Sequence, residues 1–553
     1  MPVEPTASAG ASSSTRTGLD LRQVPWVRPL AGDYAFNFKT VASLYAGDPA
    51  SPDAWESAIE RAQHHPRRRS EVVRMLEAQQ LRRGAPPEAI AAAKTLLDPD
   101  SVAIVTGQQA GAFGGPLFTI LKAITTIQLA RRTAEQHNTT AVAVFWVDAE
   151  DHDWEEVASC TVLDAGFQPR TITLAPPEGA GEIPVAGLTL DSRIEESLSQ
   201  LKDALAPTDF TEWTLNAFRS AYRPGAKMGH AFARWLEGLL GPYGLIVFES
   251  ADPSAKPLVA DVFARELASP GRTAALAASA GDALASRGHA PQVVPQPDSL
   301  SLFYLDDVRR PIKPGNDGFV VGERAYSTPD LTAQAASAPE RFSPNVLLRP
   351  IVQDTLFPTA AYVAGPSELA YLGQLGGVYQ HFGVPMPLMY PRATATLIDS
   401  ATARFLAKYH VPLPELQAQD ESALNRLLES QLPEALEQAV KDAEDTVRRS
   451  MRRVIDAMPA LDPTLAGAAR TVLGKMEHEL QTLHSKMIHA AKKRHETLRR
   501  QFMRAQAQTF PHGQPQERII AGAFFLNRYG PALVDRLLEE LPLELGRHWV
   551  LTI

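Results

Sequence analysis

Residues 102–123 read VAIVTGQQAGAFGGPLFTILKA, and residues 141–157 read AVAVFWVDAEDHDWEEV. Each stretch opens with an apolar run typical of a buried strand, and the first run continues through a glycine-rich turn into an amphipathic helical pattern. A strand, a crossover helix and a second strand form a βαβ unit, whose two strands are parallel. In open α/β sheets ligands bind beyond the carboxyl ends of the strands, where both polar clusters of this sequence lie.

The glycine-rich turn is the first candidate site. Glycines allow tight turns and close approach of the backbone to a ligand, and the start of the next helix offers free N–H groups to a phosphate or carboxylate. We therefore predict binding of nucleotide phosphates or another anion at Gly107, Gln108, Gln109, Gly111, Gly114 and Gly115. The turn matches neither the Walker A pattern nor G-x-G-x-x-G. The alternative is that these glycines only let the helix pack on the strand.

The second candidate site is the acidic cluster Glu150, Asp151, His152 and Asp153, to which we assign the catalytic role. Carboxylates at this place would receive a substrate amine, act as general bases or hold Mg²⁺, and the histidine would transfer a proton or bond a phosphate. The alternative is a helix N-terminus whose acids suit the helix dipole. The spacing contains no zinc motif, so no dedicated protein metal site is predicted.

The sheet is expected to resume after residue 345. The segments 346–351, 360–364 and 386–390 are strand-like, and Ser367 is predicted to cap a helix that runs to about residue 382. This region carries the predicted substrate-binding residues, which are Arg349, Gln353, Glu368, Tyr371 and Arg392. Its two arginines are suited to bidentate binding of a carboxylate or phosphate, although each alone is more often a structural ion-pair partner.

A chain of 553 residues is too long for one hydrophobic core. The predicted order is a disordered tail (1–24), the first half of a Rossmann-like parallel-sheet core (25–160), a first insertion (161–230), a continuation of the core (231–290), a second insertion built as a small β meander (291–345), the second half of the core (346–410), a helical coiled-coil domain (411–510) and a segment that returns to the core (511–553).

The helical domain shows a heptad stripe. Its apolar positions alternate in steps of three and four residues: Leu473, Met476, Leu480, Leu483, Met487 and Ala490. Pro459 and Pro463 interrupt the helical pattern, which predicts an antiparallel hairpin. A narrow apolar stripe needs a partner helix, from the other arm of the hairpin or from a second subunit. We expect a homodimer.

Composition excludes several classes of function. The net charge is −9, with 54 basic and 63 acidic residues, which argues against a nucleic-acid-binding protein. The single cysteine, Cys160, excludes an intrachain disulfide and suits a reducing compartment. We interpret Cys160 as a buried structural residue. No apolar run approaches the ~20 residues of a membrane span. We therefore expect a cytoplasmic protein without a membrane partner.

Five stretches together resemble one protein family: TGQQAGAFGGPLFTILKAIT (106–125), FWVDAEDHDWEE (145–156), LLRPIVQDTLFPTAAYVAGPSELAYLGQL (347–375), FGVPMPLMYPRATATLID (382–399) and QERIIAGAFFLNRYGP (516–531). They are similar in order and content to the bacillithiol-biosynthesis cysteine-adding enzymes, a family of cysteine ligases. The resemblance runs from about Pro25 to the C-terminus. It implies a Rossmann-like core with two connecting-peptide insertions and a C-terminal coiled coil that mediates dimerisation.

The resemblance also implies a reaction, the joining of L-cysteine to the glucosamine nitrogen of glucosaminyl malate. Amide formation requires an activated carboxyl group, so ATP with Mg²⁺ is the expected activator. By position, residues 150–153 would stand where related nucleotidyltransferases and class I synthetases carry their histidine motif, but the chain has no K-M-S-K-S loop. The alternatives are a non-catalytic scaffolding protein on a nucleotide fold and a nucleotidyltransferase that acts on a small sugar or acid.

Overall fold

The predicted βαβ unit is present in the computed structural model, which describes residues 16–296, 299–462 and 464–553. Strand β2 (Val102–Gln109) is followed by helix α5 (Phe118–His137) and strand β3 (Ala141–Asp148). The two strands are parallel along their whole length, with Val102 opposite Ala141 and Gln109 opposite Asp148. The glycine-rich turn and the acidic cluster therefore begin at the same edge of one sheet.

This sheet has five strands in the spatial order β13-β12-β2-β3-β6, and the neighbouring strands are parallel. Its other members are β6 (Leu245–Glu249), β12 (Thr359–Ala364) and β13 (Leu388–Pro391). The chain builds outward from β2 to β3 and β6, then returns to the other side of β2 with β12. The gap between β2 and β12 is thus the topological switch point, where open α/β sheets bind their ligands.

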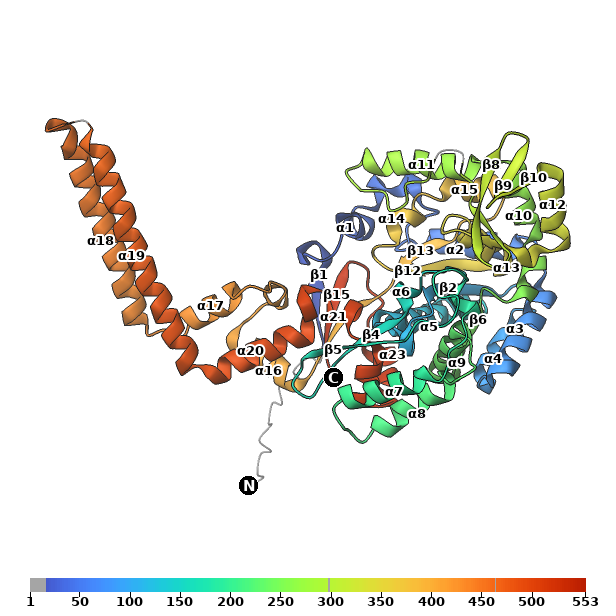
Figure 1. The fold of residues 1–553 in the computed structure, drawn as a ribbon, viewed down its shortest axis with the longest axis horizontal. Helices are drawn as coiled ribbons and strands as arrows, with labels where there is room; N and C mark the ends of the chain where they lie inside the picture. The colour runs from blue at the N-terminus through green and yellow to red at the C-terminus, as the bar shows by residue number, and fades with distance from the viewer. Residues whose placement is uncertain (1–15, 297–298, 463) are drawn as a thin grey trace, which may run out of the picture. The chain divides into compact units, whose positions relative to one another are not determined.

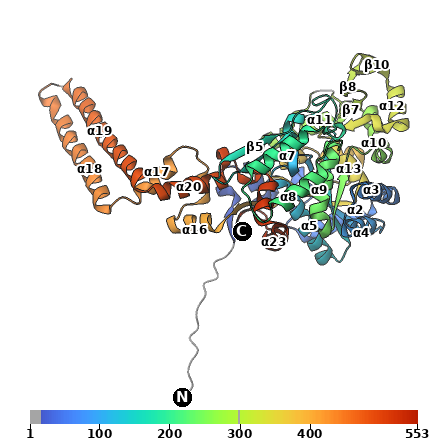
Figure 2. The same cartoon turned by 60° about the horizontal axis from the view of Figure 1, so that its bottom comes forward.

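Helices cover both faces of the sheet (Figures 1 and 2). Alternate side chains of a strand point to opposite faces. Val105, Val144 and Trp146 belong to a core cluster with Val72 and Val73 of α3 (Arg69–Arg83). Helices α5 and α9 (Met228–Leu240) also pack on the sheet. Phe145 meets Phe232 of α9 with ring centroids 6.1 Å apart.

Two insertions interrupt the core. In the first, β4 (Ser159–Leu163) and β5 (Pro169–Thr173) form an antiparallel hairpin, and helices α7 (Arg193–Ala204) and α8 (Thr211–Ala221) follow. The second contains the predicted meander, an antiparallel sheet in the order β10-β9-β8-β7-β11. Its strands are β7 (Leu302–Leu305), β8 (Arg309–Gly315), β9 (Gly318–Val321), β10 (Arg324–Ser327) and β11 (Phe342–Pro344). Helix α12 (Thr328–Ser337) connects β10 to β11.

Two local predictions after residue 345 are wrong. Residues 346–351 do not form a strand, because helix α13 (Arg349–Leu356) begins there with Pro350 in its first turn. Nearly every side chain of α13 is buried, so the segment lacks the one-sided apolar pattern that identifies a surface helix. Ser367 does not cap a long helix. The region forms two short helices, α14 (Leu369–Leu372) and α15 (Gly376–Phe382), and the Ser367 hydroxyl accepts a hydrogen bond from Arg518.

The two ends of the described chain share a smaller sheet. Strand β1 (Arg16–Asp20) pairs antiparallel with β15 (Arg547–Thr552), which also neighbours β14 (Thr394–Ile398). The predicted tail is therefore wrong for residues 16–24, which include β1, while residues 1–15 lie outside the described part. Helix α22 (Gly522–Tyr529) is largely buried. The C-terminal segment thus belongs to the same compact unit as the parallel sheet.

His548 of β15 predicts an acid-sensitive sheet. The ring is fully buried between the hydroxyls of Thr394 and Thr396, and burial lowers its pKa to about 4. In the unfolded chain His548 is protonated as the pH falls below about 6.5, whereas in the folded chain it is protonated only near pH 4. Stability is therefore lost as pH falls through this window, by about 3 kcal/mol. Urea unfolding should show that the free energy of unfolding falls less between pH 7 and pH 4.5 in His548→Gln than in the wild type. An equal fall in the two proteins would mean that His548 does not cause the acid sensitivity.

Residues 398–514 form a separate helical unit. Its helices are α16 (Ser400–Tyr409), α17 (Ser422–Glu429), α18 (Glu434–Ala457), α19 (Leu465–Arg494) and α20 (Glu496–Thr509). Helices α18 and α19 lie side by side as the predicted hairpin (Figure 1), with Arg448 and Glu477 paired at 3.3 Å. Pro463 lies outside the described residues. None of the helices in the described ranges has the length and apolar composition of a membrane span.

Candidate active site

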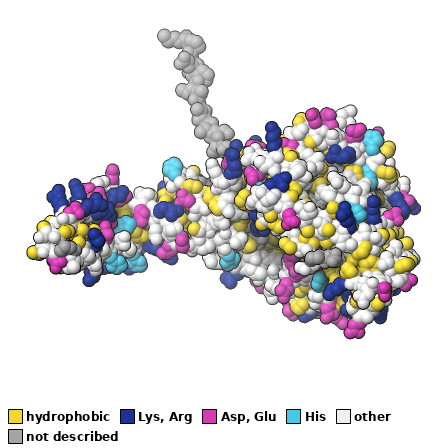
Figure 3. Space-filling view, turned by 90° about the horizontal axis from the view of Figure 1, so that it is seen from above, with side chains coloured by type: hydrophobic (Ala, Val, Ile, Leu, Met, Phe, Trp, Pro, Cys, Tyr) yellow, Lys and Arg dark blue, Asp and Glu magenta, His cyan; other side chains and the backbone are white. Residues whose placement is uncertain are grey.

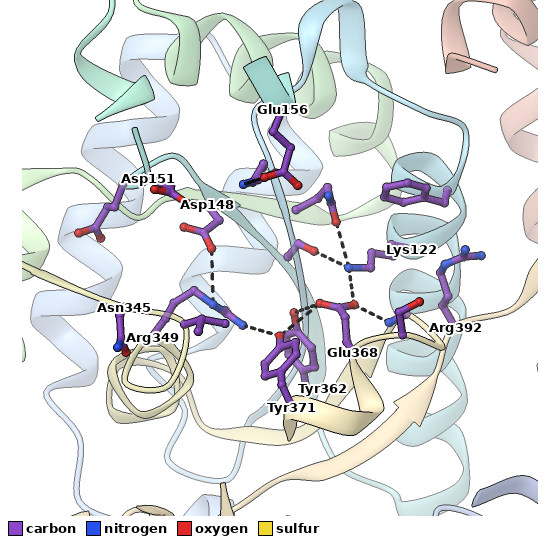
Figure 4. A pocket seen from close by; sticks show the side chains of 18 of the residues that line it. Lys122, Asp148, Asp151, Glu156, Asn345, Arg349, Tyr362, Glu368, Tyr371 and Arg392 are labelled. Atoms are coloured by element: carbon purple, nitrogen blue, oxygen red, sulfur yellow. Dashed lines mark hydrogen bonds and ion pairs between the residues drawn. The ribbon is translucent and has the colours of Figure 1, made fainter. Parts of the chain in front are cut away.

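A cavity of about 410 Å³ lies beyond the carboxyl ends of β2, β3 and β12, at the switch point of the sheet (Figure 4). Its walls come from the end of β2, the loop after β3, the start of α13 and the loop after β12. The lining residues are Gly107, Gln108, Gln109, Phe118, Lys122, Asp148, Glu150, Asp151, Glu156, Arg309, Pro344, Asn345, Val346, Arg349, Tyr362, Gly365, Pro366, Ser367, Glu368, Tyr371, Arg392 and Arg518.

Lys122 joins the walls on either side of the switch point. Its ammonium group donates to the Gly107 carbonyl at 2.8 Å and to Gln108 Oε1 at 3.1 Å, and it pairs with Glu368 Oε2 at 2.6 Å. The side chain is 2% exposed. Burial lowers the pKa of Lys122, while the charge of Glu368 opposes that shift. Lys122 therefore holds the end of β2 against the loop after β12.

Glu368 is the acceptor at the centre of this network. Its carboxylate accepts the Gly365 N–H at 2.5 Å and the Tyr371 hydroxyl at 3.3 Å. Burial opposes its charge, but Lys122, the Gly365 N–H and Arg349 together outweigh burial and lower the pKa of Glu368. The group is thus an ionised structural acceptor.

Arg349 extends the network across the cavity. Its guanidinium donates to the Tyr371 hydroxyl at 3.2 Å and to Gln353 Oε1 at 3.1 Å, and lies 3.5 Å from Asp148 Oδ2. Gln353 does not line the cavity but holds Arg349 from behind. Burial raises the pKa of Asp148, whose side chain keeps a third of its surface exposed. Asp148 is therefore a carboxyl group suited to accept a proton.

Two residues of the acidic cluster, Glu150 and Asp151, line the cavity, and the other two do not. Glu150 faces the cavity but is buried and paired with Lys256 at 2.5 Å. Asp151 also lines it and accepts from Arg309 at 3.2 Å. Burial lowers the pKa of Arg309. Both carboxylates are thus neutralised by basic residues from other segments.

His152 and Asp153 do not line the cavity. The His152 side chain is 43% exposed and lies beside Asp151, with its Nδ1 3.1 Å from the carboxylate. Asp153 caps helix α6 (Trp154–Val157) by accepting the Glu156 N–H at 3.1 Å. Asp153 therefore matches the alternative interpretation, in which the acidic residues lie at the N-terminus of a helix. The proton-transfer role predicted for this cluster fits Asp148 better than His152 or Asp153, because Asp148 lines the cavity.

Only part of the glycine-rich turn lines the cavity. Gly107, Gln108 and Gln109 line the cavity, whereas Gly111, Gly114 and Gly115 do not. Gly114 has a φ of +86°, and a Cβ there would lie 2.3 Å from the Trp235 ring. Tyr222 bridges the turn by accepting the Gly114 N–H and donating to the Gly111 carbonyl. Gly114 thus allows close packing against Trp235, and Gly115 has a positive φ of +68° that favours glycine.

Arg392 and Arg518 form the remaining wall. Arg392 is 4% exposed and makes a bidentate pair with Glu517, at 2.9 and 2.7 Å. Arg518 donates to the Ser367 hydroxyl at 2.6 Å, and within the described residues no carboxylate lies within ion-pair distance of it. Burial and the neighbouring Arg392 lower the pKa of Arg518. Arg518 is thus the cavity cation best placed to take an external anion.

Several of these residues were not assigned from sequence. Lys122 lies within the amphipathic helix that follows the glycine-rich turn, and nothing in the local pattern marks it as a site residue. Arg309 belongs to the second insertion and has no local signal at all. Arg518 lies within the quoted motif of residues 516–531, which pointed to the region but not to this side chain.

The cavity fits an anionic ligand better than a resident metal ion. Asp148, Glu150 and Asp151 each have an arginine or lysine partner. Among the described residues, no three His, Cys, Asp or Glu side chains are grouped as a metal ion requires. These carboxylates therefore do not form a dedicated protein site for Mg²⁺.

Cys160 takes no part in the cavity. The thiol is buried in strand β4, and burial raises its pKa to about 12. A thiolate nucleophile needs a lowered pKa. The structure supports the interpretation of Cys160 as a packing residue.

Comparison with known proteins assigns both parts of the chain to one family. Residues 18–393 match the family model described as Bacillithiol biosynthesis BshC, N-terminal Rossmann-like domain, and residues 395–553 match its C-terminal coiled-coil domain. A Salinibacter ruber protein named "Putative cysteine ligase BshC" is 35% identical over 527 residues, covering 94% of this chain and 95% of that protein. A Koribacter versatilis protein of the same name is 32% identical and covers 94% and 97%.

Proposed function

The chain belongs to the BshC family of bacillithiol biosynthesis, the cysteine ligases, and on this premise we propose that it joins the carboxyl group of L-cysteine to the glucosamine nitrogen of glucosaminyl malate. One observation supports this most: the cavity at the switch point combines Arg518, which has no carboxylate partner among the described residues, with Asp148, a carboxyl group of raised pKa. The first suits an anionic substrate, and the second suits proton removal from an amine.

Arg518 is proposed to bind a carboxylate of the malate moiety. Malate carries two carboxylates, and a guanidinium binds such a group with two parallel hydrogen bonds. Arg392 is already hydrogen-bonded to Glu517. Instead of the substrate binding predicted from sequence, we assign it the role of positioning the neighbouring Arg518. Arg349 contacts Asp148 and Tyr371 and would orient the reacting groups from the opposite wall.

Asp148 is proposed as the general base. An attacking amine must lose a proton as the amide forms, and a base of raised pKa is matched to this task. Arg349 lies 3.5 Å away and would stabilise the carboxylate before it accepts the proton.

ATP is proposed as the cosubstrate that activates the cysteine carboxyl group. Gly107 and Gln108 at the end of β2, together with Phe118 at the start of α5, line the cavity. The first N–H groups of a helix lack intrahelical acceptors and attract anions. The nucleotide phosphates would therefore lie between the end of β2 and the start of α5.

Asp148→Asn is expected to lower kcat about 100-fold or more, because it removes the proposed proton acceptor. The acidic limb of the pH–rate profile should disappear with it, since this limb would report the pKa of Asp148, which burial raises. Asp153→Asn is the matched control, because asparagine also caps helices and residue 153 lies outside the cavity. Equal losses in the two variants would remove Asp148 from the mechanism.

The reaction itself is tested by incubating the purified chain with ATP, Mg²⁺, L-cysteine and glucosaminyl malate. Mass spectrometry should detect a cysteine-dependent amide product and one nucleotide product. AMP would indicate an adenylate and ADP an acyl phosphate. Absence of product, with each substrate shown to bind, would contradict the proposed reaction for the chain alone.

The helical unit is proposed to form a homodimer. Met476 and Leu483 of the predicted stripe remain 43% and 50% exposed on α19, beside Val472 at 45%. Charged and histidine side chains surround hydrophobic ones on this hairpin (Figure 3). Sedimentation velocity should show a dimer, and Met476→Glu/Leu483→Glu should sediment as a monomer. Lys475 is an exposed neighbour of these residues, and the control variant Lys475→Glu should remain dimeric. If Met476→Glu/Leu483→Glu also remains dimeric, the dimer interface does not include these two residues.

A further inference from the structure

A second cavity lies beyond the same edge of the sheet, next to β6 instead of β12. Its volume is about 500 Å³, and it lies between the end of β6, the start of α9 and the loop before α9. The residues that line it are Arg82, Val147, Ala149, Ala186, Ala221, Arg223, Gly225, Ala226, Lys227, Gly229, His230, Arg234, Glu249, Ser250, Ala251, Asp252 and Pro253. It shares no lining residue with the first cavity.

The loop after β3 separates the two cavities. Val147 and Ala149 line the second cavity, whereas Asp148 and Glu150 line the first. Successive residues of an extended chain point to opposite sides, which explains the alternation. A ligand in the second cavity would therefore contact the same loop as the proposed active site, from its other face.

The second cavity has an excess of positive charge. Its two carboxylates already have cationic partners, because Asp252 pairs with Arg82 and Glu249 pairs with Arg83 at 2.6 Å and His230 at 3.4 Å. In contrast, Arg223, Lys227 and Arg234 have no side-chain hydrogen bond or ion pair in the described part of the chain. Three cations without a carboxylate partner among the described residues thus line one cavity, which is the electrostatic pattern of an anion site.

A buried hydroxyl gives independent support. Ser250 is 3% exposed and lines the cavity, yet its Oγ has no hydrogen-bond partner among the described residues. Buried polar groups are nearly always satisfied, so an unpaired one indicates a missing partner. A hydroxyl can donate to an anionic oxygen.

The start of helix α9 adds donors after Met228, whose own N–H already donates to the Leu188 carbonyl. Helix α9 begins at Met228, and Lys227 and Gly229 at its N-terminus line the cavity. Its first N–H groups carry partial positive charge. A Cβ on Gly229 would lie 3.3 Å from both Ala149 and Ala186, so a larger residue would press on the cavity wall.

We propose that this second cavity binds a phosphate group, either as free phosphate or as the phosphate ester of a small metabolite. Guanidinium, ammonium and hydroxyl donors together with a helix N-terminus match the several acceptor oxygens of phosphate. The site is separate from the proposed active site and does not depend on the cysteine ligase reaction.

The test is calorimetric titration of the full chain with inorganic phosphate and, separately, with glucose 6-phosphate. Arg223→Ala/Lys227→Ala should weaken binding about 100-fold and Ser250→Ala about tenfold. Arg131→Ala removes an exposed arginine outside both cavities and should bind as wild type. Arg518→Ala tests the first cavity, and it should leave phosphate binding in the second cavity intact.

Circular dichroism melts show whether each variant is folded. Tighter binding of glucose 6-phosphate than of phosphate would identify an ester as the ligand, and the reverse order would identify the free ion. Phosphate affinity that is unchanged in both the double variant and Ser250→Ala would overturn the proposal. Binding that is lost only in Arg518→Ala would place the phosphate in the first cavity and would also overturn it.

Discussion

Lys122→Met is expected to lower kcat/KM about 100-fold, although Lys122 has no direct role in the proposed chemistry. All three N–H donors of its ammonium group are engaged, by Gly107, Gln108 and Glu368. The lysine thereby sets the distance between the two loops that flank the switch point. Misplacement of bound groups by about 1 Å costs on the order of 100-fold in rate.

The same substitution should also destabilise the fold. Glu368 would be left ionised and without its cationic partner, which costs about 3–5 kcal/mol in other buried pairs. Unfolding in urea measures this loss. Lys122→Met/Glu368→Leu removes both charges and should recover much of the stability.

The double variant separates the two effects. If Lys122 positions the loops, activity should stay low in Lys122→Met/Glu368→Leu even where stability returns. Recovery of activity together with stability would mean that the pair is only structural. Steady-state assays at a temperature where both variants are folded distinguish these outcomes.

Arg392→Met is expected to reduce the free energy of unfolding by about 3–5 kcal/mol. Arg392 and Glu517 are both 4% exposed and are joined by two hydrogen bonds. Loss of the arginine leaves a buried carboxylate whose other partner is the Ala395 N–H. Arg392 also meets the face of the Phe118 ring, with a distance of 5.6 Å to the ring centroid, so its removal loosens the start of α5.

Arg392→Met/Glu517→Met tests this assignment. Removal of both charges should return most of the lost stability, because the unpaired carboxylate is gone. Arg518→Met, one residue from Glu517, is the matched control and should cost less stability, since in the described part of the chain the Arg518 side chain has only the Ser367 hydroxyl as its hydrogen-bond partner. If Arg518→Met loses as much free energy of unfolding as Arg392→Met, the loss in Arg392→Met does not come from breaking the buried ion pair with Glu517.

Local pattern predicted the elements that carry the cavity. The apolar runs of residues 102–109 and 141–148, with a helical pattern between them, specify a parallel βαβ unit because a crossover helix requires it. Pro459 and Pro463, which interrupt the helical pattern, predicted the α18–α19 hairpin, and the heptad stripe predicted that α19 packs against another helix. Where the local pattern was ambiguous, prediction failed: α13 is buried on nearly all sides, and its apolar residues resemble a strand.

The sequence by itself determined the parallel sheet, its ligand-binding edge, the insertions and the helical hairpin, since these follow from periodicities of two and 3.6 residues within short segments. Only the tertiary structure decided which polar side chains meet at that edge. Each of the pairs Lys122–Glu368, Asp151–Arg309 and Arg392–Glu517 joins segments more than 100 residues apart, and Arg309 lies in an insertion that carries no local signal for a site residue. Ion pairing depends on distance in space, which no local periodicity records.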